Sequence, residues 1–271
     1  MSEARRKFVA AAHERALRSS ETVANLQPES QPDRHITAGE AVRGQRILDI
    51  GCGTALDVWY LATDNQVVGL DVAPGLLHWA RQHGVQPLLS DAEDTLPFAD
   101  QAFDYVVIKD VFEHLVDPSH LLREAHRVLG DEGWLVANVP NHFFFWGRMR
   151  MLLGKGLMWK TVFGDHSRFY REWDYQHLRF FTWAGFQEFL TQVEFARVEY
   201  VWEFGELLYH PEESIIARMD EPDFRMRRLA PVLKPLVHLF FALFPQPLRA
   251  AIGRWRPNLF SASFYARCIK P

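Results

Sequence analysis

Short apolar runs recur along the first half of the chain, each bounded by glycine, proline or charged residues. They occupy residues 46–50, 66–71, 85–89, 103–108 and 133–139. Runs without polar alternation are typical of strands that are buried on both faces of a parallel sheet. Helical stretches separate them, and we expect helices that begin near Thr54 and Pro74 and over residues 118–129. The alternation of strand and helix predicts an α/β fold with a doubly wound parallel sheet.

The same pattern returns later in the chain, after an interruption. A helix is expected over residues 183–193, a strand over 194–204 and a closing strand within 259–268. Two stretches, about 141–181 and 206–257, lack this periodicity, and we interpret them as insertions that form a helical and aromatic cap. The aromatic residues of the first stretch suit either a lid or a hydrophobic cluster that covers the sheet.

The beginning of the chain has a different character. Residues 3–24 read as a helix, and the proline-containing stretch 27–39 reads as a linker. The predicted organisation is therefore an N-terminal helical arm and linker at 1–40, followed by one domain at 41–271 that carries the two insertions.

Composition and charge narrow the class of protein. The 271 residues carry 30 Lys and Arg against 34 Asp and Glu, a net charge of −4, which gives no general attraction for nucleic acid. Two cysteines, Cys52 and Cys268, lack the spacing of a disulfide framework or a metal site. The N-terminus has no apolar core of a secretory signal, and residues 232–244 are too short to span a bilayer. We expect a cytoplasmic protein without a transmembrane helix.

The run at 46–50 ends in two closely spaced glycines, Gly51 and Gly53. Glycine allows a sharp turn and lets a ligand lie directly against the backbone. The N–H groups of a following helix would point into the same space. A dinucleotide fingerprint would need a third glycine at position 56, where the chain has Leu56.

With Asp49 two residues before Gly51, this turn resembles the first motif of the class I S-adenosylmethionine-dependent methyltransferases, D/E-x-G-x-G-x-G. Ala55 stands where the third glycine is usual. It suits two interpretations: it tightens the turn, or it marks a site that no longer supports activity. The resemblance implies a seven-stranded sheet with an antiparallel last strand, and S-adenosyl-L-methionine as the cofactor.

Later motifs follow in the family's order. Asp71, in Leu-Asp-Val, resembles the acid that binds the ribose hydroxyls, and a carboxylate suits that role because it only accepts hydrogen bonds. Asp91 and Ala92 resemble the adenine-binding segment, and Lys109 lies where the family binds the methionine portion. The resemblance implies these cofactor-binding residues: Asp49, Gly51, Cys52, Gly53, Asp71, Val72, Asp91, Ala92 and Lys109.

The candidate catalytic residue is His114, which follows the run at 103–108. Methyl transfer from a sulfonium is an in-line displacement, so one general base is enough, and histidine titrates in the right range. The alternative is that His114 only packs locally. In the ubiquinone-pathway O-methyltransferases a similar Glu-x-x-Glu-His segment binds a divalent metal, which implies Asp110, Glu113 and His114 as alternative metal ligands.

The expected activity is O-methylation, with N-methylation as the alternative, of a small metabolite, lipid precursor or glycan. His177-Leu-Arg-Phe-Phe-Thr182 resembles a segment of small-molecule and polysaccharide-tailoring members. A non-catalytic homologue that binds cofactor or a partner is the other class considered, and a nucleic-acid substrate is not expected. The basic and apolar stretch at 224–250 suits either a peripheral membrane contact or a helical layer on the core. The sequence leaves the oligomeric state open.

Overall fold

Seven strands form one sheet, and most of them coincide with the apolar runs. The computed structural model describes residues 34–37, 41–154, 177–201, 212, 216, 219–220, 227–261 and 263–271. The strands are β1 (Arg46–Ile50), β2 (Gln66–Asp71), β3 (Gln86–Leu89), β4 (Phe103–Lys109), β5 (Leu129–Pro140), β6 (Arg197–Val201) and β7 (Ser263–Ile269). The predicted helical arm over 3–24 and most of the linker lie outside the described residues.

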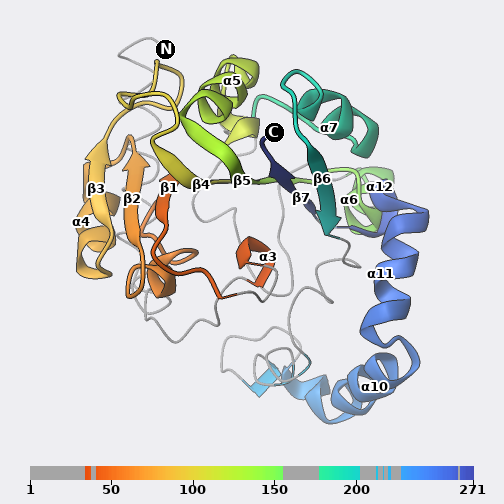
Figure 1. The fold of residues 1–271 in the computed structure, drawn as a ribbon. Helices are drawn as coiled ribbons and strands as arrows, with labels where there is room; N and C mark the ends of the chain where they lie inside the picture. The colour runs from red at the N-terminus through yellow and green to blue at the C-terminus, as the bar shows by residue number, and fades with distance from the viewer. Residues whose placement is uncertain are drawn as a thin grey trace. The chain divides into compact units, whose positions relative to one another are not determined.

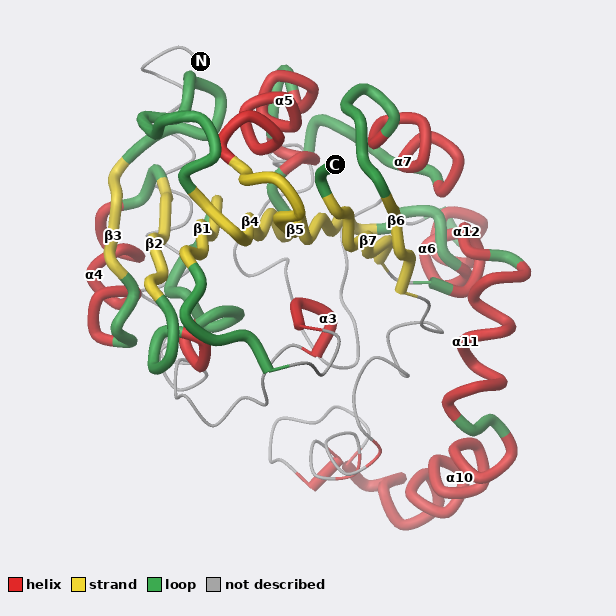
Figure 2. The backbone as a smooth tube through the Cα atoms, viewed as in Figure 1, coloured by secondary structure: helices red, strands yellow, loops and turns green. Residues whose placement is uncertain are grey.

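The sheet has the order β3-β2-β1-β4-β5-β7-β6 (Figures 1 and 2). The pairs β1–β2, β2–β3, β1–β4 and β4–β5 are parallel, and β6 pairs antiparallel with β7. This confirms the predicted doubly wound, seven-stranded sheet with an antiparallel last strand. The chain reverses its direction of winding between β1 and β4, so β1 lies at the switch point where α/β sheets bind ligands.

The strands are apolar because both faces of the sheet are covered. On one face, Ile47, Val67, Val107 and Val136 come from four neighbouring strands and belong to a single buried cluster. Side chains of a strand alternate between faces, so residues two apart in one strand share a face, and Tyr105 of β4 joins this layer together with Val107. Burial of such side chains stabilises the fold by roughly 1.5–3 kcal/mol each.

Three helices of the sheet-bearing part begin near the predicted positions: α4 (Pro74–Gln82), α5 (Pro118–Val128) and α7 (Trp183–Leu190). Proline at the first turn of α4 and α5 suits a position whose N–H has no helical partner. Asp117 caps α5 by accepting from the His120 N–H, and Thr182 caps α7 by accepting from the Gly185 N–H.

The prediction of a helix that begins near Thr54 is wrong. Turns follow Gly51, and the one helical element between β1 and β2 is the single 3₁₀ turn η1 (Trp59–Leu61). Ala55 has a left-handed backbone with φ of +64°, which a right-handed helix cannot contain.

The chain divides into two compact units, each described here by itself. The first holds residues 1–139, 176–201 and 265–271, and the second holds 140–175 and 202–264. The predicted arm and the predicted insertion boundaries stay predictions.

In the second unit the described helices are α6 (Phe145–Leu152), η5 (Arg227–Leu229), α10 (Ala230–Leu243), α11 (Gln246–Trp255) and α12 (Pro257–Phe260). Asn141 fixes one end of this unit, because its amide donates to the carbonyls of Ser261 and Asn258 at 2.6 and 3.2 Å. Within the described ranges no single helix has the length and apolarity to cross a bilayer. Ala230–Leu243 and Pro247–Trp255 pass that test only together, with an 80° bend between them.

Candidate functional site

The loop after β1 folds through three left-handed residues. Gly51, Gly53 and Ala55 have φ of +73°, +53° and +64°. A Cβ on Gly51 would lie 2.4 Å from a methyl of Val111, so this position tolerates no side chain. A Cβ on Gly53 would meet no atom of the described residues within 4 Å, which leaves space against the backbone on this side. The loop therefore has the shape that a backbone-bound ligand needs.

Ala55 keeps the glycine-like backbone although it carries a methyl group. The residue is fully buried, and its left-handed conformation costs roughly 1 kcal/mol relative to glycine. Its N–H donates to the Cys52 carbonyl at 2.7 Å, and its carbonyl accepts from the Trp59 N–H at 2.8 Å. The alanine is thus accommodated by a hydrogen-bonded turn.

Asp71, the last residue of β2, holds this loop. One carboxylate oxygen accepts from the Gly53 N–H at 2.9 Å and the other from the Ala73 N–H at 2.8 Å. A carboxylate has about four lone-pair sites, so each oxygen can still accept from a ligand hydroxyl. Val72 is half-buried beside it.

Asp49 lies within β1 and is buried. Burial raises the pKa of its carboxyl well above the usual value, and the negative charges of Asp57 and Asp71 raise it further, while Lys109 opposes the shift. Asp49 is therefore a buried acid whose charge depends on its cationic neighbour.

Lys109, at the end of β4, makes an ion pair of 2.6 Å with Asp57 Oδ1. The lysine side chain is 11% exposed, and its ammonium lies 6.0 Å from the centre of the Tyr265 ring. Sequence reasoning did not single out Asp57. The available signal was an acid placed just after the glycine turn.

The side chain of Cys52 packs against Gly69 of β2. A Cβ on Gly69 would lie 2.7 Å from the Cys52 sulfur, so the thiol occupies the space above the glycine of β2. Burial raises the pKa of Cys52, which keeps the thiol neutral. Cys52 thus packs against β2 through its side chain and offers its backbone to the loop.

The loop after β3 carries Asp91 and Ala92, which are both buried. Asp91 Oδ1 accepts from the Glu93 N–H at 3.0 Å, an Asx-type turn that fixes the carboxylate. The Glu93 carboxylate in turn accepts from the Val116 N–H at 2.6 Å. The loop is thereby tied to the segment that follows β4.

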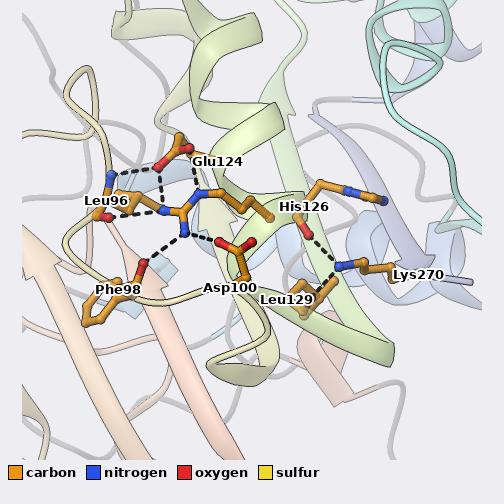
Figure 3. A network of polar contacts seen from close by, with 8 residues as sticks. Leu96, Phe98, Asp100, Glu124, His126, Leu129 and Lys270 are labelled. Carbon is orange, nitrogen blue, oxygen red and sulfur yellow. Dashed lines mark hydrogen bonds and ion pairs between the residues drawn. The ribbon is translucent and has the colours of Figure 1, made fainter.

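Arg127 of α5 clamps the continuation of this loop (Figure 3). Its guanidinium donates to the carbonyls of Leu96 and Phe98 at 3.1 and 2.9 Å and pairs with Asp100 at 2.8 Å. It also pairs with Glu124 at 2.7 Å, and Glu124 accepts from the Leu96 N–H at 2.8 Å. These bonds hold residues 96–100 on α5 and so position the turn that carries Asp91.

Glu113, His114 and His177 form one cluster. The Glu113 carboxylate is fully buried, and its Oε1 lies 3.8 Å from His114 Nε2 and 3.9 Å from His177 Nε2. The two imidazole rings meet edge to face with centroids 4.6 Å apart. Burial, and then the charge of Asp110, raise the pKa of Glu113. His177 was not among the predicted site residues.

The backbone brings His177 to this place. The Glu113 carbonyl accepts from the N–H groups of Leu178 and Arg179 at 2.7 and 3.0 Å. One atom from each of Glu113, His114 and His177 lies within 4.8 Å of the others, a spacing that suits a metal ion or a proton relay. Asp110 is exposed and is not part of this cluster, so the cluster differs from the implied ligand set of Asp110, Glu113 and His114.

Asn138, in β5 at the register of Lys109, is a further residue that the motifs did not reveal. It is buried, and neither polar atom of its amide has a hydrogen-bond partner among the described residues. A buried amide in this state calls for a water or ligand partner. A polar residue near the end of a buried strand was the signal that could have indicated it.

Comparisons with known proteins agree with this architecture. Residues 48–137 match a family model described as a methyltransferase domain. The chain is 31% identical over 114 residues to a ubiquinone biosynthesis O-methyltransferase of Xanthomonas oryzae pv. oryzae, covering 40% of this chain and 48% of that protein. It is 35% identical over 127 residues to a malonyl-[acyl-carrier protein] O-methyltransferase of Yersinia pestis, covering 45% and 46%. The chain thus spans about half the length of these relatives.

Among solved structures, the fold resembles a SAM-dependent methyltransferase of Thermotoga maritima, titled a possible histamine N-methyltransferase. The TM-score is 0.54 at 17% identity, and the alignment covers 98% of both chains. At this identity the likeness concerns the fold.

Proposed function

We propose that the chain is a class I S-adenosylmethionine-dependent methyltransferase that methylates an oxygen of a small metabolite, lipid precursor or glycan; its match to a methyltransferase-domain model and its fold support this. The observation that carries the proposal is the set of acids along one edge of the sheet. Asp49, Asp71 and Asp91 lie in or just after three neighbouring parallel strands, and Asp71 accepts a hydrogen bond from the Gly53 N–H.

These residues fit the chemistry of the cofactor. Ribose hydroxyls and an adenine amino group are donors, and the acids are acceptors whose oxygens have lone pairs to spare. Asp71 would bind the ribose hydroxyls. The adenine would be bound by Asp91 and the backbone of Ala92. The backbone of Gly51, Cys52 and Gly53 would contact the rest of the cofactor. Lys109, Asp49 and Val72 would border the methionine portion, for which the charged pair of Lys109 and Asp57 offers complementary groups.

When bound, S-adenosylmethionine supplies an electrophilic methyl group on a sulfonium. Transfer of that methyl group to an acceptor hydroxyl would require the protein to align the hydroxyl oxygen with it and to remove one proton from that oxygen. His114 would take that proton, with Glu113 and His177 holding its ring in place. The protein otherwise contributes position, because the displacement needs alignment more than further chemistry.

The cluster of Glu113, His114 and His177 also suits a divalent cation that would hold the acceptor oxygen. The buried carboxylate and two imidazoles are a set that transition metals accept. Activity that survives extensive dialysis against EDTA favours the proton relay. Activity that is lost to EDTA and restored by Mn²⁺ or Mg²⁺ favours the cation.

A cytoplasmic location accompanies the proposal. Its support is that Cys52 and Cys268 are both buried thiols without a disulfide bond, as expected in a reducing compartment. The alternative to an enzyme is a homologue that binds cofactor without turnover, for which Ala55 is the specific observation.

The test is a methyl-transfer assay with labelled S-adenosylmethionine and a panel of hydroxylated metabolites, isoprenoid precursors and oligosaccharides. We expect one class to accept label and S-adenosylhomocysteine to accumulate in equal amount. His114→Ala should lower kcat by about 100-fold or more, with little change in cofactor affinity. His78→Ala, an exposed histidine of α4, is the matched control and should leave kcat unchanged. Cofactor binding without turnover across the panel, unaffected by either substitution, would favour the non-catalytic homologue.

A further inference from the structure

The helix α10 presents a row of apolar side chains to solvent. Five residues form this row, and each is more than half exposed: Leu229 (53%), Val232 (64%), Leu236 (55%), Leu239 (53%) and Leu243 (60%). They recur every three or four positions, which places them on one face of the helix. We call this row the α10 stripe. Large apolar side chains scattered singly on a surface are ordinary, but a contiguous row of this kind marks an interaction site.

The stripe is not the face by which the helix is fixed to its own unit. Ala230 and Val237 are buried in a cluster with Met219, and Leu233 and Phe241 pack against that cluster. An ion pair of 2.6 Å between Lys234 and Asp220 also anchors α10. The expectation of a helical layer packed on a core thus accounts for one side of α10 and leaves the stripe without a role.

Charge identifies the kind of surface that would cover the stripe. Residues 224–257 contain seven Lys and Arg and no Asp or Glu. The acids of this unit that the structure describes, Asp220 and Glu212, pair with Lys234 and His238 of α10. Arg228, next to the first residue of the stripe, is exposed, as are Arg254 and Arg256 at the far end of α11. An apolar row with exposed cations at both ends of the α10–α11 segment is complementary to a surface that is apolar within and anionic outside.

The far end of α11 repeats this combination on a smaller scale. Trp255 is 69% exposed and Leu248 is 43% exposed. Trp255 lies between two arginines, and the Arg256 guanidinium is 5.2 Å from the centre of its ring. Tryptophan with flanking arginines is enriched at the headgroup level of membranes, because its ring is apolar and its N–H is polar.

We propose that α10 and α11 form an amphipathic surface that lies on an anionic lipid bilayer, with the α10 stripe inserted at the headgroup boundary. The proposal is independent of methyl transfer. Pairing with a second copy through the stripe is the competing arrangement. Two features speak against it: the row covers fewer than the three or four heptads of a coiled coil, and Pro235 lies inside the helix, where it lacks a backbone N–H.

Vesicle flotation with the full chain tests the proposal. We expect the protein to float with vesicles that contain about 30% phosphatidylglycerol in phosphatidylcholine. Binding should fall at least about tenfold with pure phosphatidylcholine, and also when salt is raised to about 0.5 M. The double variant Leu236→Ser/Leu239→Ser should lose binding at least about tenfold, and Arg254→Glu/Arg256→Glu should lose binding to anionic vesicles.

Leu152→Ser/Leu153→Ser is the matched control, because these leucines of the same unit are 79% and 72% exposed but lie outside the stripe. It should bind vesicles like the wild type. Unchanged circular dichroism and S-adenosylmethionine affinity show that each variant is folded. The proposal is overturned if the wild-type chain does not float with anionic vesicles at low salt, or if the stripe variant binds as well as the control. A dimer that dissociates in the stripe variant, without vesicle binding by the wild type, would overturn it in favour of self-association.

Discussion

The Lys109 ammonium lies 2.6 Å from the Asp57 carboxylate and so joins the end of β4 to the loop after β1. The same lysine opposes the raised pKa of buried Asp49. One cation therefore ties the end of β4 to the loop after β1 and keeps a second acid, Asp49, closer to its charged form.

Replacing this cation should weaken the cofactor site in a pH-dependent way. In Lys109→Met the pKa of Asp49 rises further, so its carboxylate is populated only at higher pH. We expect the affinity for S-adenosylmethionine to fall about tenfold at pH 7, and by more at pH 6 than at pH 8. Calorimetric titration at the three pH values measures this, and Lys109→Arg should recover most of the loss. An equal loss at every pH would refute the link to Asp49.

The clamp made by Arg127 should matter for stability and, through the Asp91 loop, for binding. Arg127→Met removes bonds to Leu96, Phe98 and Asp100 and leaves Glu124 without its cation. We expect the free energy of unfolding to fall by roughly 1–3 kcal/mol and cofactor affinity to fall as well. Arg123→Met, an exposed arginine of the same helix, should change unfolding by less than about 0.5 kcal/mol. Urea unfolding compares the two, and equal effects would contradict the clamp.

The same clamp predicts a pH dependence. Hydrogen bonds from Arg127 lower the pKa of Glu124, assisted by the Leu96 N–H. A carboxyl whose pKa is depressed by folding adds stability above its unfolded pKa, about 4.3, and that stability is lost as pH falls through the lower folded pKa. The stability difference between wild type and Arg127→Met should therefore be constant from pH 5 to 7 and shrink below about pH 4. Urea midpoints across this range give the answer, and a difference that grows on acidification would contradict it.

Substitutions at Ala55 test whether this alanine impairs the turn that would bind the cofactor. In Ala55→Gly the relief of the left-handed backbone is offset by the greater chain entropy of glycine, so unfolding should change by less than about 1 kcal/mol. Cofactor affinity should stay within about threefold. Ala55→Val should be destabilised by more than about 2 kcal/mol, because a β-branched residue strongly resists positive φ. A tenfold gain in affinity from glycine would instead show that the alanine impairs the site.

The sequence predicted the sheet well because its strands are buried on both faces and therefore apolar throughout. The prediction of a helix near Thr54 was wrong because it depended on a backbone conformation. The left-handed conformation of Ala55 cannot be recognised from its residue type. Contacts between distant residues were also beyond sequence-based prediction. His177 lies beside Glu113 because the next two residues, Leu178 and Arg179, donate to the Glu113 carbonyl, and Asp57 meets Lys109 because β1 and β4 are neighbours.

The exposed α10 stripe could not be predicted from the sequence either, because it too depends on packing. Periodicity shows that a helix has apolar positions, but α10 is apolar on two sides, and only packing shows which side is covered.

The most direct test of the central claim is calorimetric titration of the full chain with S-adenosylmethionine and S-adenosylhomocysteine, beside Asp71→Asn. The account predicts saturable binding of one cofactor per chain, weakened roughly 10- to 100-fold in Asp71→Asn, because the amide keeps only one acceptor oxygen. Asp64→Asn, an exposed acid paired with Arg43, should bind like the wild type. No binding of either compound by the wild-type chain at millimolar concentration would contradict the account.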